Sequence, residues 1–331
     1  MDKKLKSKIS NLRIQGKIAF NFLTNIHVHS RGDKCSVLLS IMYDTQIETS
    51  IPFFISLENG KCSKITFPST DQCLSPDKNS ESIAVYNRFF FCGYPNFVNK
   101  FFVNLTYEFV YDSESSGWSL TKKAPMIATL KGIESSHYGN ALTSVYNCIF
   151  SVGDRIAQRY DITKNIWQPL PVLSKSRIFS AVFSRQARYI YTIGGFNDKE
   201  EENVNKSFEI LDIRNIESGW KFHNYYEPIS LTKCKCIQPN DKEVMIIGGN
   251  TDVVKMLSFD SEETFYLTTP TKVAHKDSLE GTLCAVYWNG SYNILSSSGV
   301  FYRVYKTSKK IKTTKNWLET TLKIFPRCPG G

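Results

Sequence analysis

The sequence predicts an all-β protein built from repeated units, and three observations support this prediction. The first is composition: aromatic residues make up 13% of the 331 residues, and aromatic side chains favour the pleated surface of a strand. The second is a marker that recurs about every 50 residues, and the third is a series of apolar segments that end in glycine. With 41% hydrophobic and 22% charged residues, the composition differs from that of a disordered chain.

The marker is an aromatic or apolar residue followed by an acidic one, with a tryptophan further along the chain. Its three best copies are Tyr111-Asp112 with Trp118, Tyr160-Asp161 with Trp167, and Leu211-Asp212 with Trp220. Degenerate copies extend the series to Leu57-Glu58, Phe259-Asp260 and Tyr305-Lys306, and the steps are about 50 residues. We expect the aspartate to begin a turn by accepting hydrogen bonds from the backbone just ahead. The tryptophan should then start an outer strand and pack between neighbouring units.

Upstream of each marker, an apolar strand runs into glycine. The best copies end in the pairs Gly194-Gly195 and Gly248-Gly249, and weaker copies end in single glycines at Gly93 and Gly153. Glycine lets the backbone turn tightly at the end of a buried strand. Further upstream, a strand with a small residue recurs, with members Ala84, Ala141, Ala181 and Ala285. A small residue suits an innermost strand, because the units crowd together near a central axis.

These parts assemble into a six-bladed β-propeller with four-stranded antiparallel blades, of which the first and last are degenerate. A closed ring of blades buries faces that one blade alone would expose, and it protects the strand edges. The predicted blades span residues 18–70, 80–130, 135–173, 176–229, 231–272 and 280–326, within one propeller domain at 18–326. Residues 1–17 form a basic N-terminal segment and 327–331 a short tail. We expect a strand near one terminus, with Ile18, Phe20 and Phe22 as candidates, to pair with the other terminal blade.

The hydrophobic strand, the Gly-Gly pair and the Tyr with a spaced Trp resemble the kelch-repeat family over roughly residues 82–270. We expect no separate BTB, F-box or catalytic domain beside the predicted blades. In many kelch domains, an arginine at the start of an inner strand faces the mouth of the ring and contacts acidic partner peptides. The resemblance implies this role for Arg177, and Tyr138 occupies the corresponding place in the preceding blade.

The net charge of +10 is concentrated in lysines and arginines near both termini. If the termini meet, these residues form one basic surface that attracts an acidic protein partner; the alternative is a solvated lysine-rich surface. No nucleic-acid recognition motif accompanies the lysines, and no apolar run is long enough to insert into a membrane. The nine cysteines are scattered without a C-x-x-C pair, which favours a reducing, cytoplasmic setting.

Catalytic signatures of other propellers are not recognisable in the sequence. The pairs His27/His29 and Cys234/Cys236 each place two ligand atoms on one face of a strand, but two ligands alone are a weak indication of a metal site. We therefore predict no catalytic, cofactor-binding or metal-binding residues. The predicted function is a non-enzymatic scaffold or adaptor that presents propeller loops to protein partners, including as a subunit of a larger or cytoskeletal assembly. The alternatives are the substrate-recognition subunit of a ubiquitin ligase and a propeller enzyme acting on carbohydrate.

Overall fold

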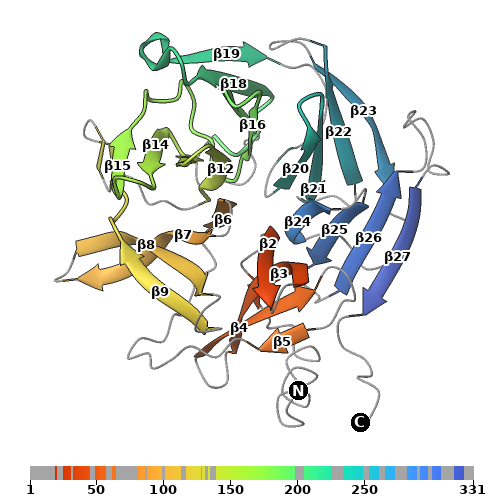
Figure 1. Ribbon diagram of the computed structural model, residues 1–331. Helices are drawn as coiled ribbons and strands as arrows, with labels where there is room; N and C mark the ends of the chain where they lie inside the picture. Colours follow the sequence, from red (N-terminus) through yellow and green to blue (C-terminus); the bar gives the residue numbers. More distant parts are fainter. Residues whose placement is uncertain are drawn as a thin grey trace, which may run out of the picture.

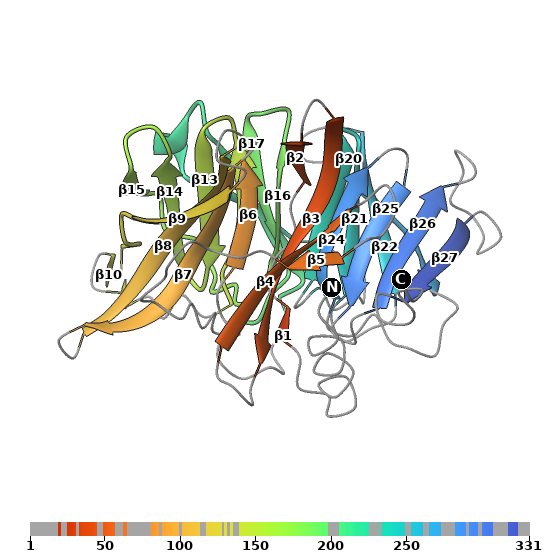
Figure 2. The same ribbon diagram turned by 60° about the horizontal axis from the view of Figure 1, so that its bottom comes forward.

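The computed structural model consists of antiparallel sheets arranged around a central axis (Figure 1). It describes residues 19–20, 25–30, 33–44, 49–56, 62–64, 81–85, 88–98, 101–112, 117–127, 129–130, 133–134, 139–197, 205–224, 231, 234–248, 253–260, 265–272, 282–288, 291–296, 300–306 and 317–323. In the tilted view of Figure 2, the innermost strands β6, β16 and β20 run along the axis rather than across it.

Five sheets have four strands each, in sequence order from the axis outward. The first is β6 (Glu81–Val85), β7 (Arg88–Val98), β8 (Phe101–Asp112) and β9 (Gly117–Lys123). The second is β12 (Ala141–Val145), β13 (Cys148–Gly153), β14 (Ile156–Asp161) and β15 (Ile166–Pro169). The third is β16 (Ala181–Arg185), β17 (Tyr189–Ile193), β18 (Ser207–Asp212) and β19 (Trp220–Asn224). The fourth is β20 (Cys234–Asn240), β21 (Glu243–Gly248), β22 (Val253–Phe259) and β23 (Phe265–Lys272). The fifth is β24 (Thr282–Trp288), β25 (Ser291–Ser296), β26 (Val300–Lys306) and β27 (Trp317–Lys323).

A further sheet at the N-terminus contains β1 (Ala19–Phe20), β2 (Asn25–Ser30), β3 (Asp33–Asp44), β4 (Thr49–Ser56) and β5 (Cys62–Lys64). Strands β1 and β2 both pair with β3, with Phe20 opposite Met42 and Ser30 opposite Asp33. The prediction that Phe20 pairs with the opposite terminal blade is therefore wrong, because the segment completes the inner edge of its own sheet. Ile18 and Phe22 lie outside the described residues. A short hairpin, β10 (Thr129–Leu130) with β11 (Ile133–Glu134), follows the β6–β9 sheet.

The tryptophan markers are in register across the outer two strands of their sheets. The residue before the aspartate pairs with the tryptophan in all three copies: Tyr111 with Trp118, Tyr160 with Trp167, and Leu211 with Trp220. Asp161 Oδ1 accepts hydrogen bonds from the amides of Thr163 and Lys164, both at 3.0 Å. Asp212 Oδ1 accepts one from the amide of Arg214 at 3.0 Å. These bonds confirm the turn predicted after the aspartate, at Asp161 and Asp212.

In the second and third four-stranded sheets, the second strand supplies the buried centre of the blade. Every residue of β17 is buried, and so are five of the six residues of β13. Gly194 and Gly195 follow β17 with φ of 70° and 80°, in the left-handed region that glycine tolerates best. A Cβ at Gly194 would lie 2.2 Å from the Leu231 carbonyl oxygen, so this turn also needs the absence of a side chain. Gly248 ends β21, whereas Gly249 lies outside the described residues.

Hydrophobic clusters join neighbouring sheets. Strands β6, β12, β16, β20 and β24 contact one another in that order at the centre of the molecule. One cluster, which includes Phe90 and Tyr160, lies between the first and second four-stranded sheets. A second cluster, which includes Val182, lies between the second and third sheets, and a third cluster, with Phe183 and Leu257, lies between the third and fourth. Four consecutive sheets, from β6–β9 to β20–β23, are thus packed as blades through described side chains. This confirms an all-β propeller with four-stranded antiparallel blades.

The tryptophans of the markers bridge these blades, as the sequence predicts. Trp167 Nε1 lies 3.0 Å from Thr106 Oγ1 and 3.2 Å from the Ala124 carbonyl oxygen, both in or just after the preceding sheet. Trp220 Nε1 donates to the Pro171 carbonyl oxygen, 2.9 Å away, in the segment that follows the preceding sheet. The side chain of Trp118 lies outside the described residues.

Candidate interaction surface between two blades

The segment 170–180 links the outer strand β15 of one blade to the inner strand β16 of the next. Three backbone hydrogen bonds hold it against the earlier blade: Leu170 to the Ala157 oxygen at 3.0 Å, Leu173 to Arg155 at 3.1 Å, and Arg177 to Asp154 at 2.7 Å. We call this segment the linker. The linker lies at the end of the blades where the second strands run into glycine. We call this end of the blades the glycine end.

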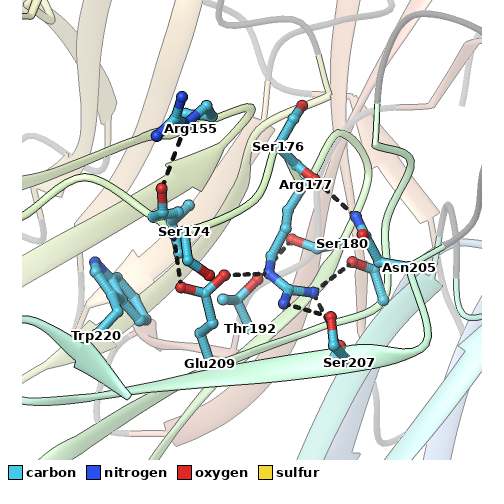
Figure 3. A network of polar contacts seen from close by, with 12 residues as sticks. Arg155, Ser174, Ser176, Arg177, Ser180, Thr192, Asn205, Ser207, Glu209 and Trp220 are labelled. Carbon is cyan, nitrogen blue, oxygen red and sulfur yellow. Dashed lines mark hydrogen bonds and ion pairs between the residues drawn. The ribbon is translucent and has the colours of Figure 1, made fainter. Parts of the chain in front are cut away.

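Arg177, at the end of this linker, is fully buried with Glu209 of β18 (Figure 3). Its Nε donates to Glu209 Oε1 at 2.9 Å, and one terminal nitrogen donates to the carbonyl oxygens of Gly194 and Ser207 at 3.0 and 2.9 Å. The other terminal nitrogen donates to Ser207 Oγ at 2.8 Å. A buried charge is tolerated when it is paired and its hydrogen bonds are satisfied, and this arrangement meets both conditions.

The second oxygen of Glu209 holds the linker itself. Glu209 Oε2 accepts a hydrogen bond from the amide of Ser174 at 2.9 Å, and Asn205 Nδ2 donates to the Ser176 carbonyl oxygen at 2.7 Å (Figure 3). One blade earlier, Gln158 makes the equivalent contact, because its Oε1 accepts from the amide of Ile127 at 2.9 Å. A buried polar side chain on the third strand therefore fixes the backbone that enters its blade from the preceding one.

Above this buried network, the surface is cationic. Arg155, Lys175 and Lys206 are exposed, and each lies next to a residue that the network binds. Phe222 on β19 is 37% exposed, and Lys175 Nζ lies 5.0 Å from the centre of its ring, within the range of a cation–π interaction. We call these four residues the linker surface. Among the described residues, no ion pair includes Arg155, Lys175 or Lys206.

The linker surface is electrostatically suited to an acidic partner. Asp154 is half-buried, and its Oδ1 accepts a hydrogen bond from Ser176 Oγ at 2.7 Å. Glu209 is fully buried beneath Arg177. The described carboxylates of this junction are thus turned toward the linker, while the cations project outward. Among the described residues, the exposed charges of this junction are therefore cationic, and such charges complement an acidic segment.

Of the two partner-binding residues predicted from the sequence, Arg177 is at this junction but inside it. With no exposed surface, its side chain positions the linker and offers nothing to a partner. Tyr138 lies outside the described residues. The sequence analysis missed Arg155, Lys175 and Lys206, which are ordinary basic residues in polar segments. The one available signal was the sequence Ser174-Lys175-Ser176, directly before the arginine that was singled out.

Among the cysteines whose side chains are described, Cys92, Cys148 and Cys236 are thiols outside any disulfide bond, and burial raises the pKa of Cys92 and Cys236. Within the described ranges, no three side chains of His, Cys, Asp or Glu are gathered as metal ligands. Helices that could cross a lipid bilayer, by length and apolar character, are likewise not found in the described part of the chain.

No protein-family model matches the chain, and no curated protein matches its sequence. Among solved structures, one described as "Structure of YjhT" is similar with a TM-score of 0.50 and 13% sequence identity. The similarity covers 72% of this chain and 75% of that chain. At this level of identity, the likeness concerns the fold alone.

Proposed function

We propose that this chain is a six-bladed propeller of the kelch type that acts as a non-enzymatic scaffold for protein–protein interactions in the cytoplasm. Two observations support six blades. The strands β1–β5 and β24–β27 form sheets on the same ring as the four packed blades (Figure 1). The strand bounds of all six sheets also fall inside the ranges that the repeat spacing predicts. The Tyr-Asp and Trp pairs in register, beside strands that run into glycine, support the kelch type.

The observation that carries the proposed function is the linker surface. Arg155, Lys175 and Lys206 stand on backbone that the Arg177–Glu209 network holds in place. A backbone that is already fixed does not have to be ordered on binding, and complementary charge speeds and orients association. Phe222 adds apolar contact area at the same place. We therefore propose that the partner presents an acidic segment with at least one apolar side chain to this junction.

The test is affinity purification with mass spectrometry of the wild type and the variant R155E/K175E/K206E. A matched control reverses three exposed cations at the opposite end of the blades, K164E/R214E/K242E. Because both variants change the net charge equally, general electrostatic attraction should weaken equally in both. We expect at least one partner to be lost with the first variant and retained with the control.

Retention of every wild-type partner by R155E/K175E/K206E would overturn the linker surface as the binding site. Equal loss of partners with both variants would show binding to net charge rather than to a site. The same purification separates a scaffold from a ubiquitin-ligase subunit, because a ligase subunit should recover a cullin together with its substrate.

A further inference from the structure

Lys235 of β20 and Glu81 of β6 form an ion pair although they are far apart along the chain. Lys235 Nζ lies 2.7 Å from Glu81 Oε1 and 2.6 Å from Glu81 Oε2, so both carboxylate oxygens face one ammonium group. Strands β6 and β20 are not neighbours in the ring, because β12 and β16 lie between them in the order of contacts. The pair therefore crosses the centre of the molecule, where Figure 1 shows β6 and β20 on different sides.

Strand register places the two charges at one level of the ring. Glu81 pairs with Cys92, and Lys235 pairs with Ile247. In the blades between them, Ala141 pairs with Val152 and Ala181 with Ile193. Each of these second-strand partners immediately precedes a glycine in the sequence: Gly93, Gly248, Gly153 and Gly194. The four inner-strand residues thus form one layer near the glycine end.

Side-chain length within this layer explains how the pair can form. The two intervening positions carry only the methyl groups of Ala141 and Ala181, and Ala181 is fully buried. The two long charged side chains stand on the separated blades. Both methyl groups pack with the hydrophobic clusters between blades, so neither extends into the centre of the ring. The small residues expected of innermost strands therefore leave room for one long ionic contact.

We propose that the Glu81–Lys235 ion pair is a lock across the ring, which couples two non-adjacent blades and closes the ring's centre to solvent near the glycine end. The side chains of Glu81 and Lys235 are 25% and 32% exposed, so the pair lies at the boundary between the packed blades and water. Exposed pairs add little to global stability. The effect of the lock is therefore local: it restrains the innermost strands and keeps water from their edges.

The first test is proximity in the full-length protein. A carbodiimide activates a carboxylate, and attack by a nearby lysine amine forms an amide bond as the activating group leaves as a urea. We expect a cross-linked peptide that joins Glu81 to Lys235. The pair Lys164–Asp161, with Lys164 Nζ 3.8 Å from Asp161 Oδ2 and both side chains accessible to the reagent, is the internal control. Cross-linking of Lys164 to Asp161 without any Glu81–Lys235 product would overturn the lock.

The second test is hydrogen–deuterium exchange of K235M, E81Q and the charge swap E81K/K235E. We expect several-fold faster exchange in peptides from β6 and β20 in both single variants, with outer strands β9 and β19 unchanged. The swap should restore slow exchange, because it rebuilds the pair with the charges reversed. Unchanged exchange in the single variants would contradict the lock. Faster exchange everywhere would also contradict it, since that result indicates general destabilisation. The lock needs no binding partner, so its failure leaves the proposed scaffold function untouched, and the reverse also holds.

Discussion

The guanidinium of Arg177 and the carboxylate of Glu209 are both 0% exposed, and each neutralises the other. Such a pair adds little net stability when intact, because two charges had to leave water. Removing one partner is different, since the other charge remains buried without compensation. The role of Arg177 is therefore to keep Glu209 in place, and Glu209 in turn holds the amide of Ser174.

We expect R177M to lower the free energy of unfolding by about 3–5 kcal/mol, because Glu209 would then be a buried charge without its partner. Urea unfolding followed by circular dichroism measures this loss. The double variant R177M/E209Q should lose less than R177M alone, since glutamine removes the buried charge and still accepts from Ser174. If R177M were as stable as the wild type, the assignment of Arg177 as a buried positioning residue would be wrong.

Glu108 is a second buried carboxylate, and its environment makes stability depend on pH. Burial by itself would raise the pKa of Glu108, but hydrogen bonds from Arg88 and Lys123 outweigh it and lower the pKa below the ordinary value of 4.5 for this carboxyl group. At neutral pH, the carboxylate is charged in both the folded and the unfolded state, and its ion pairs stabilise the fold. As the pH falls from about 4.5 through the lowered pKa, the unfolded state takes up the proton first. This contribution is then lost.

We expect E108Q to be less stable than the wild type at pH 7 and to lose less stability between pH 5 and pH 3. Urea unfolding across this pH range measures both quantities. The control is E217Q, because Glu217 is exposed in the 3-10 helix η1 (Ile216–Ser218). If the free energy of unfolding of E108Q fell with pH as steeply as that of the wild type, other carboxylates would cause the acid sensitivity.

At the scale of the strand and turn, the contacts between blades come from the tryptophans of the markers. Trp167 is 8% exposed and donates to two acceptors of the preceding blade, whereas Trp220 is half-buried and donates to one. Thr106 is fully buried, so loss of the indole donor would leave its hydroxyl without this partner. A buried polar group that loses a hydrogen bond costs about 1–3 kcal/mol.

W167F should therefore destabilise the protein by about 1–3 kcal/mol, and by more than W220F does. Phenylalanine removes the donor together with one ring of the indole, so the loss combines the hydrogen bonds with a cavity, and both effects are larger at the more buried Trp167. The free energy of unfolding of each variant in urea is the measurement. A loss in W220F that equals or exceeds the loss in W167F would contradict the stronger attachment of Trp167 to its preceding blade.

The turn after β17 offers a test of glycine with a matched control. Gly194 and Gly219 have almost the same backbone angle, with φ of 70° and 72°. A Cβ at Gly194 would meet the Leu231 carbonyl oxygen at 2.2 Å, while at Gly219 the nearest atom is Pro171 Cβ at 3.9 Å. Both alanine variants place a side chain at a positive φ that L residues rarely adopt, but only the first also creates a steric clash.

Gly219 has a ψ of −169°, which together with its positive φ lies in a region that is almost restricted to glycine. We expect G219A to cost about 1–3 kcal/mol for this backbone strain, and G194A to cost clearly more because of the added clash. Thermal unfolding of both variants gives the comparison. The additional loss of stability in G194A reports how closely the backbone at Leu231, which follows β19, approaches the turn at Gly194. Equal losses would indicate that backbone angle alone selects glycine at position 194.

At the scale of the whole molecule, local features could be predicted from the sequence and distant pairings could not. The Tyr160 and Trp167 pair is formed within one hairpin, so its spacing reveals the blade. The burial of Arg177 depends on Glu209, 32 residues further along the chain, and the residues between them give no sign of it. Lys235 and Glu81 are 154 residues apart, so only the assembled ring brings them together. A contact within one blade recurs in the other blades and is therefore visible as a repeat in the sequence. A contact between two particular blades occurs once, so no repeat reveals it.

The contacts between blades also determine how the molecule unfolds. Hydrophobic clusters and tryptophan bonds run without interruption from the β6–β9 sheet to the β20–β23 sheet. An open array of repeats can fray from its ends, but each described blade here shares its core with a neighbour. We therefore expect a single urea transition, with coincident midpoints by tryptophan fluorescence and far-ultraviolet circular dichroism. W167F, which weakens one junction, should shift both midpoints together to lower urea. Separate fluorescence and circular dichroism transitions in W167F would instead show that the blades on either side of that junction unfold independently.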